Sequence, residues 1–158
     1  MKRAGTGWDI HKLVEGRALI LGGVKIDSVK GCLGHSDGDA LIHAVIDALL
    51  GAAALGDIGS HFPDTEDAFK GISSMILLAK TSELLRNNGY KIVNIDSTVI
   101  LQSPKLSPYK EKMAEGIALC LGLDAGCVSV KAKTAEHMLG ELGTGDAVVC
   151  QAIAMIEK

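Results

Sequence analysis

Asp9 and His11 lie two residues apart in Gly5 to Leu13, a segment in which polar and apolar side chains alternate. Such alternation predicts a β-strand, whose residues i and i+2 share one face at a Cα spacing of roughly 7 Å. A third candidate ligand, His43, follows Asp39 in an apolar segment typical of the start of a helix. Two imidazoles and one carboxylate suit zinc, and three protein ligands leave one coordination position for water or substrate. A catalytic zinc site therefore requires a fold in which this strand meets this helix.

Each of the three residues also has an ordinary structural interpretation. Asp9 could cap a turn, and His43 could be a core histidine with satisfied hydrogen bonds, the commoner fate of one histidine on an apolar helix. Asp39, His43 and Asp47 are spaced i, i+4 and i+8, so they lie along one face of the predicted helix. Three ionisable groups on an apolar helix are costly to bury unless they are paired or liganded, which favours the metal hypothesis.

The size and composition of the chain favour one domain, residues 1–158, with a sizeable core. Apolar residues make up 47% of the chain but aromatic residues only 3%, so the core must consist of Ala, Val, Ile and Leu. Small apolar residues in such excess suit close packing between subunits, which favours an oligomer. The net charge is −3, and Lys and Arg form no extended cluster. Because binding to nucleic acid needs clustered phosphate contacts, nucleic acid is not an expected partner.

No targeting or membrane segment is expected. No apolar run follows the basic start of the chain, so no secretory signal is predicted. The most apolar stretch, residues 40–55, is interrupted by His43 and Asp47 and is too short to span a bilayer. The four cysteines form no C-x-x-C pair and are interpreted as reduced core residues of a cytoplasmic protein. They are Cys32, Cys120, Cys127 and Cys150.

The pattern of apolar residues and chain breakers predicts an α+β fold. Expected strands, besides the one at Asp9, span residues 17–26, 90–101, 128–133 and 147–156, the first interrupted or bulged at Gly22-Gly23. Expected helices span residues 39–54, 73–88 and 108–121, with Asp37 or Asp39 capping the first. Residues 31–38 and 56–70 are expected to be loops. This order of elements predicts a mixed sheet with helices stacked on one face.

Several polar segments are candidates for binding phosphates or sugars. Gly34 to Asp39 precedes a helix N-terminus, which attracts anions, although an ordinary turn with a cap would look the same. Asp57 and Asp64 lie in acidic loops suited to sugar hydroxyls, and the alternative is solvated loops. Lys131 to Glu136 offers cations, a hydroxyl and a carboxylate that suits Mg²⁺ together with phosphate oxygens. Each lysine on its own is more often a solvated surface residue.

Together these segments resemble the 2-C-methyl-D-erythritol 2,4-cyclodiphosphate synthase family of non-mevalonate isoprenoid synthesis. The resemblance runs from Gly5 to the C-terminus. Its most specific motifs are Asp9-Ile-His11, His35-Ser-Asp-Gly-Asp-Ala-Leu-Ile-His43, Gly51-Ala-Ala-Ala-Leu-Gly-Asp-Ile-Gly59 and Phe62-Pro-Asp-Thr65. Several long motifs in one order make chance agreement improbable.

The resemblance implies a phosphorus–oxygen lyase that depends on divalent metals. Its substrate would be 4-diphosphocytidyl-2-C-methyl-D-erythritol 2-phosphate, which is cyclised to 2-C-methyl-D-erythritol 2,4-cyclodiphosphate with release of CMP. The 2-phosphate oxygen of the substrate attacks the β-phosphorus, so the protein needs to supply positioning and charge neutralisation but no nucleophile. The family is a homotrimer whose sheets pack around a threefold axis, with active sites between neighbouring subunits.

The resemblance also assigns roles to individual residues of this chain. Zn²⁺ would be bound by Asp9, His11 and His43, and Mg²⁺ or Mn²⁺ by Glu136. His35 and Thr134 match the catalytic residues that stabilise the transition state. The residues implied in substrate binding are Asp9, His11, Ser36, Asp57, Ile58, Gly59, Phe62, Pro63, Asp64, Thr65, Glu66, Leu101, Gln102, Ser103, Pro104, Lys105, Leu106, Ser107, Lys133 and Glu136.

Within the substrate-binding set, the resemblance separates three contacts. Asp57 and Gly59 match the turn that binds the ribose, and Asp64 matches the contact to the erythritol hydroxyls. Residues 101–107 match the pocket for the cytidine.

The segment after Glu136 departs from the bacterial members of this family. It lacks the Phe and Arg that line a central cavity for isoprenoid diphosphates in some members, which puts such binding in doubt here. Lys133 stands where many relatives have Thr, and it keeps a hydrogen-bond donor beside the phosphates. Two other functions stay open: a nucleotide phosphohydrolase that uses zinc-bound water, and a non-catalytic trimeric module that binds nucleotides.

Overall fold

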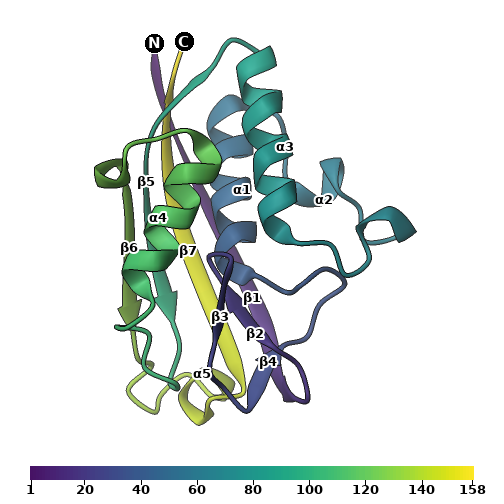
Figure 1. The fold of residues 1–158 in the computed structure, drawn as a ribbon, viewed down its shortest axis with the longest axis vertical. Helices are drawn as coiled ribbons and strands as arrows, with labels where there is room; N and C mark the ends of the chain where they lie inside the picture. The colour runs from purple at the N-terminus through teal and green to yellow at the C-terminus, as the bar shows by residue number, and fades with distance from the viewer.

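The structure is a computed structural model that describes residues 1–158 and has an α+β architecture (Figure 1). Its main sheet has the strand order β4-β1-β7-β5-β6, in which only β5 and β6 are parallel neighbours. The five strands are β1 (Lys2–Glu15), β4 (Lys30–Cys32), β5 (Lys91–Ile100), β6 (Val128–Lys133) and β7 (Ala147–Glu157). The mixed sheet predicted from the order of elements is therefore confirmed.

Three long helices follow the predicted positions closely. They are α1 (Ala40–Ala53), α3 (Ser74–Asn87) and α4 (Lys110–Leu121). Short helical turns, α2 (Ile58–His61), α5 (Glu141–Thr144) and the 3₁₀ turns Asp67–Phe69 and Ala125–Cys127, complete the connections. Two of these turns lie in residues 56–70, which were expected to be loop.

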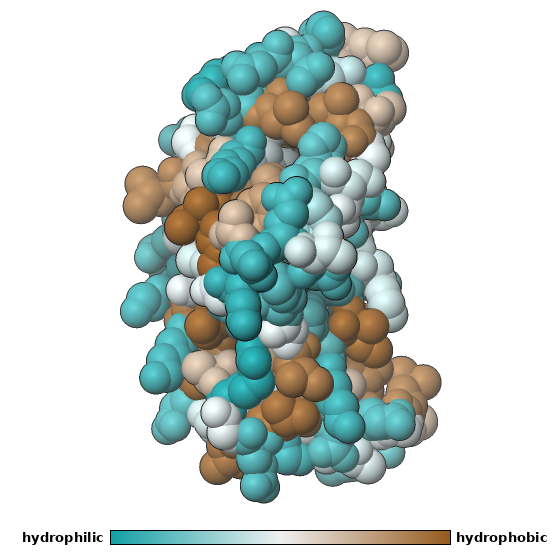
Figure 2. Space-filling model, turned by 90° about the vertical axis from the view of Figure 1, so that its right-hand side faces the viewer, coloured by the Kyte–Doolittle hydropathy of each residue, from teal (hydrophilic) through white to brown (hydrophobic).

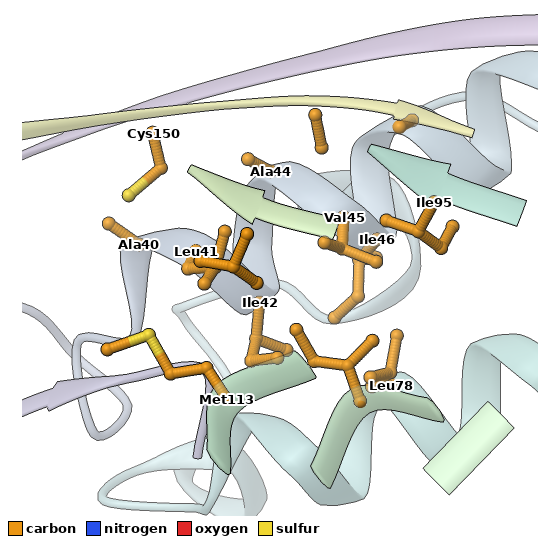
Figure 3. Packing of buried hydrophobic residues seen from close by; sticks show 14 of the residues in the cluster. Ala40, Leu41, Ile42, Ala44, Val45, Ile46, Leu78, Ile95, Met113 and Cys150 are labelled. Carbon is orange, nitrogen blue, oxygen red and sulfur yellow. The ribbon is translucent and has the colours of Figure 1, made fainter. Parts of the chain in front are cut away.

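Helix α1 is the centre of the hydrophobic core. In Figure 3, Ala40 and Ala44 point toward the strands near Cys150, whereas Ile42 and Ile46 point toward Leu78 and Met113 on the neighbouring helices. Helix α1 is buried on most sides and is apolar there, and His43 and Asp47 lie on its one polar face. The small side chains face the sheet and the large ones face the second helical layer.

The sheet and α1 approach each other unusually closely, and two glycines of β1 make this possible. A Cβ atom built on Gly7 would lie 1.9 Å from the carbonyl oxygen of Ala44. One built on Gly5 would lie 2.2 Å from the carbonyl oxygen of Ala48. Only glycine leaves room for the helix backbone at these positions, so the two glycines fix where α1 lies along β1.

The predicted strand over residues 17–26 is instead a hairpin of two short strands, β2 (Leu19–Leu21) and β3 (Val24–Ile26). Gly22 and Gly23 have φ angles of 60° and 73°, so the chain reverses there rather than bulging. Asp39 anchors the hairpin, because its carboxylate accepts the N–H groups of Gly22 at 2.9 Å and Gly23 at 2.7 Å. It also accepts from Ile42 N–H and so caps α1, as one of the two predicted capping residues.

Two further differences concern the edges of the predicted elements. Residues 31–38 were expected to be a loop, but their first two residues belong to β4, which pairs with the end of β1. The strand at Asp9 spans 14 residues and pairs with β7 along most of its length. Pairing with strands distant in sequence extends both elements beyond what the local pattern predicts.

The face of the sheet away from α1 is uncovered in this chain. Trp8, Ile10 and Ile153 expose 52%, 48% and 50% of their surface there. Trp8 and Ile153 line a hollow of about 480 Å³ whose other lining residues are mostly polar. In contrast, the side of the molecule that carries α2 and α3 is mostly hydrophilic, with apolar atoms in separate groups (Figure 2). The open sheet face is therefore the more apolar candidate for contact with another subunit.

The cysteines and the helices bear on two further expectations. All four cysteines are free, but only Cys32 and Cys150 belong to the core, whereas Cys120 and Cys127 are half-buried. Burial raises the pKa of the Cys32 thiol to about 12, so that thiol is not reactive. No helix combines the length and the hydropathy needed to span a bilayer.

Candidate functional site

Asp9, His11 and His43 converge as the sequence predicted. His11 Nε2 lies 2.9 Å and His43 Nδ1 3.1 Å from the same oxygen, Asp9 Oδ2. The two ring nitrogens are 3.4 Å apart. One ligand atom of each residue therefore faces a common point, and the three side chains could hold a metal ion.

The glycine-mediated approach of α1 to β1 explains this convergence. Gly7, Asp9 and His11 alternate along β1 and so point to the same side of the sheet as Gly5. Ala44 packs against Gly7, which places the preceding residue, His43, over Asp9. The position of the site thus follows from the backbone contact between strand and helix.

The distances fit a tetrahedral zinc ion. Ligand atoms that lie about 2.0–2.1 Å from zinc in a tetrahedron are separated from each other by about 3.3 Å. The observed separations of 2.9, 3.1 and 3.4 Å are close to that value. Two nitrogens and one carboxylate oxygen form a donor set that zinc prefers, and no fourth protein ligand completes it.

Both imidazoles are held by hydrogen bonds on the side away from the site. His11 Nδ1 lies 2.8 Å from the carbonyl oxygen of Leu33. A carbonyl can only accept, so Nδ1 donates to it and Nε2 is the ring nitrogen that is left to bind a metal beside Asp9. On the other ring, His43 Nε2 lies 2.9 Å from Ser74 Oγ and 3.2 Å from Ser36 Oγ.

The electrostatics of Asp9, His11 and His43, together called the triad, favour an ionised Asp9 carboxylate. Burial alone raises the pKa of Asp9, but the hydrogen bonds with His11 and His43 outweigh it and lower this pKa to about 2. Burial lowers the pKa of His11, and the contacts with Asp9 and the Leu33 carbonyl outweigh that effect and raise it. A charged carboxylate is therefore available as a ligand at neutral pH.

A pocket of about 360 Å³ opens over the triad. It brings together most of the first half of the predicted substrate-binding set. Its lining includes Asp9, His11, His35, Ser36, His43, Ile58, Gly59, Phe62, Pro63 and Asp64. Phe69 and Leu77 also line the pocket and were not predicted.

Asp57, Thr65 and Glu66 are not among the lining residues of this pocket. Asp57 caps α2, because its carboxylate accepts the N–H of Ser60 at 2.9 Å. The carbonyl of Glu66 lies 3.4 Å from His35 Nε2, so this part of the loop borders the catalytic histidine predicted from the sequence.

Asp47 was noted on the face of α1 but was not predicted to take part in the site. Its Oδ1 accepts the N–H of Ile58 at 2.7 Å, which ties the start of α2 to α1. Burial raises the pKa of Asp47. The carboxylate thus positions the turn that the resemblance assigns to ribose binding, and its i+4 spacing from His43 was the available signal.

Most of the second half of the predicted set lines a different pocket, of about 190 Å³, but Ser103 and Glu136 do not line it. It is lined by Leu101, Gln102, Pro104, Lys105, Leu106, Ser107, Lys110, Ala132, Lys133 and Thr134. Lys110 is a further cation that the sequence did not single out. Just beyond, the hydroxyl of Thr134 donates to the carboxylate of Glu136, so two predicted functional residues are in contact.

The two pockets do not merge within one chain. The register aligns Asp9 with Cys150, Cys150 with Val99 and Val99 with Ala132, so the two regions lie at the same level of the sheet. Three strand spacings separate them, which is about 14 Å. One chain therefore holds the triad and the region after β6 three strands apart and not in one pocket.

A comparison with known protein families shows to which family this chain belongs. The model of the YgbB family matches residues 2–157, nearly the whole chain. The chain belongs to the YgbB family. Among curated members of this family, the 2-C-methyl-D-erythritol 2,4-cyclodiphosphate synthase of Chloroherpeton thalassium is 55% identical over 156 residues, covering 99% of both chains. The resemblance predicted from the motifs is confirmed.

Solved structures of other YgbB family proteins have the same fold. The bifunctional IspDF of Campylobacter jejuni has a TM-score of 0.94 and 42% identity, and the match covers 99% of this chain and 42% of that one. A CDP complex of the Plasmodium falciparum IspF has a TM-score of 0.84 and 38% identity, covering 98% of this chain and 95% of that one. The α+β fold class is therefore confirmed by structures as well as by sequence.

Proposed function

We propose that this chain cyclises 4-diphosphocytidyl-2-C-methyl-D-erythritol 2-phosphate to 2-C-methyl-D-erythritol 2,4-cyclodiphosphate and releases CMP. The observation that carries the proposal is the convergence of Asp9, His11 and His43 in one pocket with His35 and Ser36. Similarity to cyclodiphosphate synthases over 99% of the chain supports it. The catalytic domain would comprise residues 1–158 and act in the cytoplasm, where free cysteines persist.

The reaction requires positioning and charge neutralisation rather than a protein nucleophile. An oxygen of the 2-phosphate forms a bond to the β-phosphorus, and the bond from that phosphorus to the bridging oxygen breaks, so the electron pair leaves with CMP. Zinc held by Asp9, His11 and His43 would supply Lewis acidity and a template. His35 and Ser36 line the same pocket and would contact phosphate oxygens.

The remaining residues of this pocket would hold the sugars. Asp57, at the start of α2, and Gly59 within it would bind the ribose, and Asp64 would accept hydrogen bonds from the erythritol hydroxyls. The Asp47 carboxylate holds α2 against α1, so the ribose turn has a fixed position relative to the triad. Such rigid placement lowers the entropic cost of reaching the reactive geometry.

We further propose that the chain works as a homotrimer with active sites between subunits. The residues assigned to cytidine and to Mg²⁺ or Mn²⁺ are the 101–107 loop, Thr134 and Glu136. They follow β5 and β6, and β6 is three strands away from the β1 strand of the triad. A second copy that brings these residues to the triad would complete the site. The open, partly apolar sheet face supports packing of the three sheets around an axis.

Product analysis of the purified chain tests this function. Incubation with the cytidyl substrate and Mg²⁺ should yield CMP and the cyclic diphosphate, and a zinc chelator should abolish both products. Release of two monophosphates would instead identify a phosphohydrolase that uses zinc-bound water. Tight binding of CDP without turnover would identify a nucleotide-binding module. Sedimentation of the same sample measures whether three copies associate.

A further inference from the structure

We propose that Asp37 and Ser74 are positioning residues that fix the tautomer of His43, so that its Nδ1 lone pair faces the metal. The two residues lie in separate segments, Asp37 before α1 and Ser74 at the start of α3. Neither residue was assigned to the site from the sequence. The proposal rests on the zinc role of His43 in the proposed function and concerns how that ligand is prepared.

The three side chains form a continuous chain of hydrogen bonds. His43 Nε2 lies 2.9 Å from Ser74 Oγ, and the Ser74 hydroxyl is in turn hydrogen-bonded to Asp37 Oδ1. The backbone N–H of Ser74 donates to Asp37 Oδ2 at 2.9 Å. Ser74 is fully buried, so this arrangement has no competing water on the serine.

The direction of each hydrogen bond follows from the chemistry of Asp37. A carboxylate can only accept hydrogen bonds, so the proton of the Ser74 hydroxyl must point to Asp37. The Ser74 oxygen then presents a lone pair to His43, and His43 Nε2 must carry a proton in order to donate. Neutral imidazole has one N–H, so Nδ1 is left with the lone pair that a metal needs.

Ser36 cannot set this direction by itself. Its Oγ is 3.2 Å from His43 Nε2 and accepts the N–H of Gly38 at 3.3 Å. No carboxylate fixes the proton of the Ser36 hydroxyl, so that hydroxyl can either donate to His43 or accept from it. Ser74, tied to Asp37, is the only hydroxyl beside His43 with a defined polarity.

The test uses Asp37→Asn, which keeps the shape of Asp37 but changes its hydrogen bonding. The Asn oxygen still accepts the N–H of Ser74 and keeps the start of α3 in place. Its amide nitrogen then donates to Ser74 Oγ, so the serine proton turns toward His43 and favours the wrong tautomer, and the N–H of Asp39, which Oδ1 accepts at 3.1 Å, also loses its acceptor. Ser74→Ala only removes the hydroxyl that links Asp37 to His43, a link that we call the relay. We expect zinc affinity to fall about 100-fold in Asp37→Asn and about 10-fold in Ser74→Ala, as for other partners of metal-bound histidines.

The double variant separates the relay from a structural role. If Asp37 acts through the Ser74 hydroxyl, Asp37→Asn combined with Ser74→Ala should bind zinc as tightly as Ser74→Ala alone. The second substitution would thus rescue the first. Asp47→Asn is the matched control, because it also removes a carboxylate charge from beside α1 but does not touch His43. Its zinc affinity should change by less than about threefold.

Zinc affinity is measured by competition with a chelator, and Co²⁺ absorption reports whether the coordination stays tetrahedral. Additive losses in the double variant, or equal losses in Asp37→Asn and Asp47→Asn, would overturn the relay. These measurements need no turnover, so the relay can be contradicted without contradicting the proposed function, and the reverse. If the unaltered chain binds zinc with the expected order of variants but releases no CMP, the proposed function is wrong and the relay stands.

Discussion

The two halves of the proposed active site are built in different ways. The triad half is held between β1 and α1, and the side chains of Asp9, His11 and His43 expose only 26%, 15% and 13% of their surface. The half around Thr134 and Glu136 lies in an exposed turn after β6. In that turn Glu136, His137 and Leu139 have φ angles of 52°, 56° and 66°, a backbone conformation that costs energy for residues other than glycine.

This difference indicates which half is complete before anything binds. The triad has its ligand atoms in place and its ring nitrogens hydrogen-bonded, so a metal would find a preorganised site. The exposed turn has Gln102 as its main side-chain support and presents Glu136 to solvent. We infer that a single chain can fix the metal, whereas the other half needs a neighbouring subunit or the substrate phosphates around it.

The largest effect is expected when the two halves are inactivated on separate chains. His43→Ala and Glu136→Ala should each lower the rate of CMP release at least about 1,000-fold, because each removes a group that stabilises the phosphoryl-transfer transition state. When the two variants are unfolded together and refolded as mixed oligomers, about one quarter of the wild-type rate should return, since random mixing joins two intact halves in one site of four.

The mixing experiment can contradict the division of the site between subunits. If each chain carries a complete site, no intact site forms in the mixture and the rate stays at the level of the single variants. Simple pooling of the two folded variants without exchange is the control, and it should show no recovery.

The second prediction concerns the contact that creates the triad. Gly7→Ala places a methyl group against the Ala44 carbonyl, and backbone cannot move aside as a side chain can. We expect the free energy of unfolding to fall by about 3 kcal/mol, measured by urea denaturation, with a parallel loss of zinc affinity. Gly51→Ala is the matched control in α1, because a Cβ there meets only the Thr6 carbonyl at 3.9 Å. That variant should be more stable by about 0.5–1 kcal/mol.

Equal destabilisation by both glycine substitutions would contradict this explanation. It would mean that the close approach of α1 to β1 is not what places His43 over Asp9.

A third, smaller effect should appear within the triad half alone. Asp47→Ala leaves the N–H of Ile58 without its acceptor, so α2 loses its tie to α1. The expected cost is about 1–2 kcal/mol of stability, together with a KM for the cytidyl substrate that rises roughly 10-fold, the equivalent of one such hydrogen bond. Zinc affinity should not change. Asp47→Asn keeps an oxygen acceptor and should retain a normal KM, so a raised KM in both variants would argue against this role.

The sequence predicted the triad because its residues carry a local signal. An Asp-x-His pair on an alternating strand and a histidine near a helix start are recognisable without knowledge of the fold. The close approach between them also had a signal, since Gly5 and Gly7 alternate in β1 while Ala40, Ala44, Ala48 and Ala52 recur every four residues in α1. Small residues on two facing elements indicate that their backbones pack closely.

The groups that support the triad could not be predicted in the same way. Asp37 lies beside α1 in the sequence, where an acidic residue resembles a helix cap, yet its carboxylate accepts from the start of α3 at Ser74. Likewise, Gly22-Gly23 suggested an interrupted or bulged strand, and nothing in the sequence indicated that Asp39 anchors the turn there. Such hydrogen bonds join segments distant in sequence, so local patterns carry no record of them.

The smallest predicted effect tests the support of the exposed half. Gln102 Oε1 accepts the N–H of His137 at 3.2 Å and so holds the turn that presents Glu136. Gln102→Ala should change stability by only about 0.5 kcal/mol, the low end for one exposed hydrogen bond. The Mg²⁺ concentration that gives half-maximal CMP release should rise by about twofold, which corresponds to the same energy. If Gln102→Ala leaves the Mg²⁺ dependence unchanged, the turn holds its conformation without this support. The contrast between the preorganised triad and an exposed turn that needs further support would then disappear.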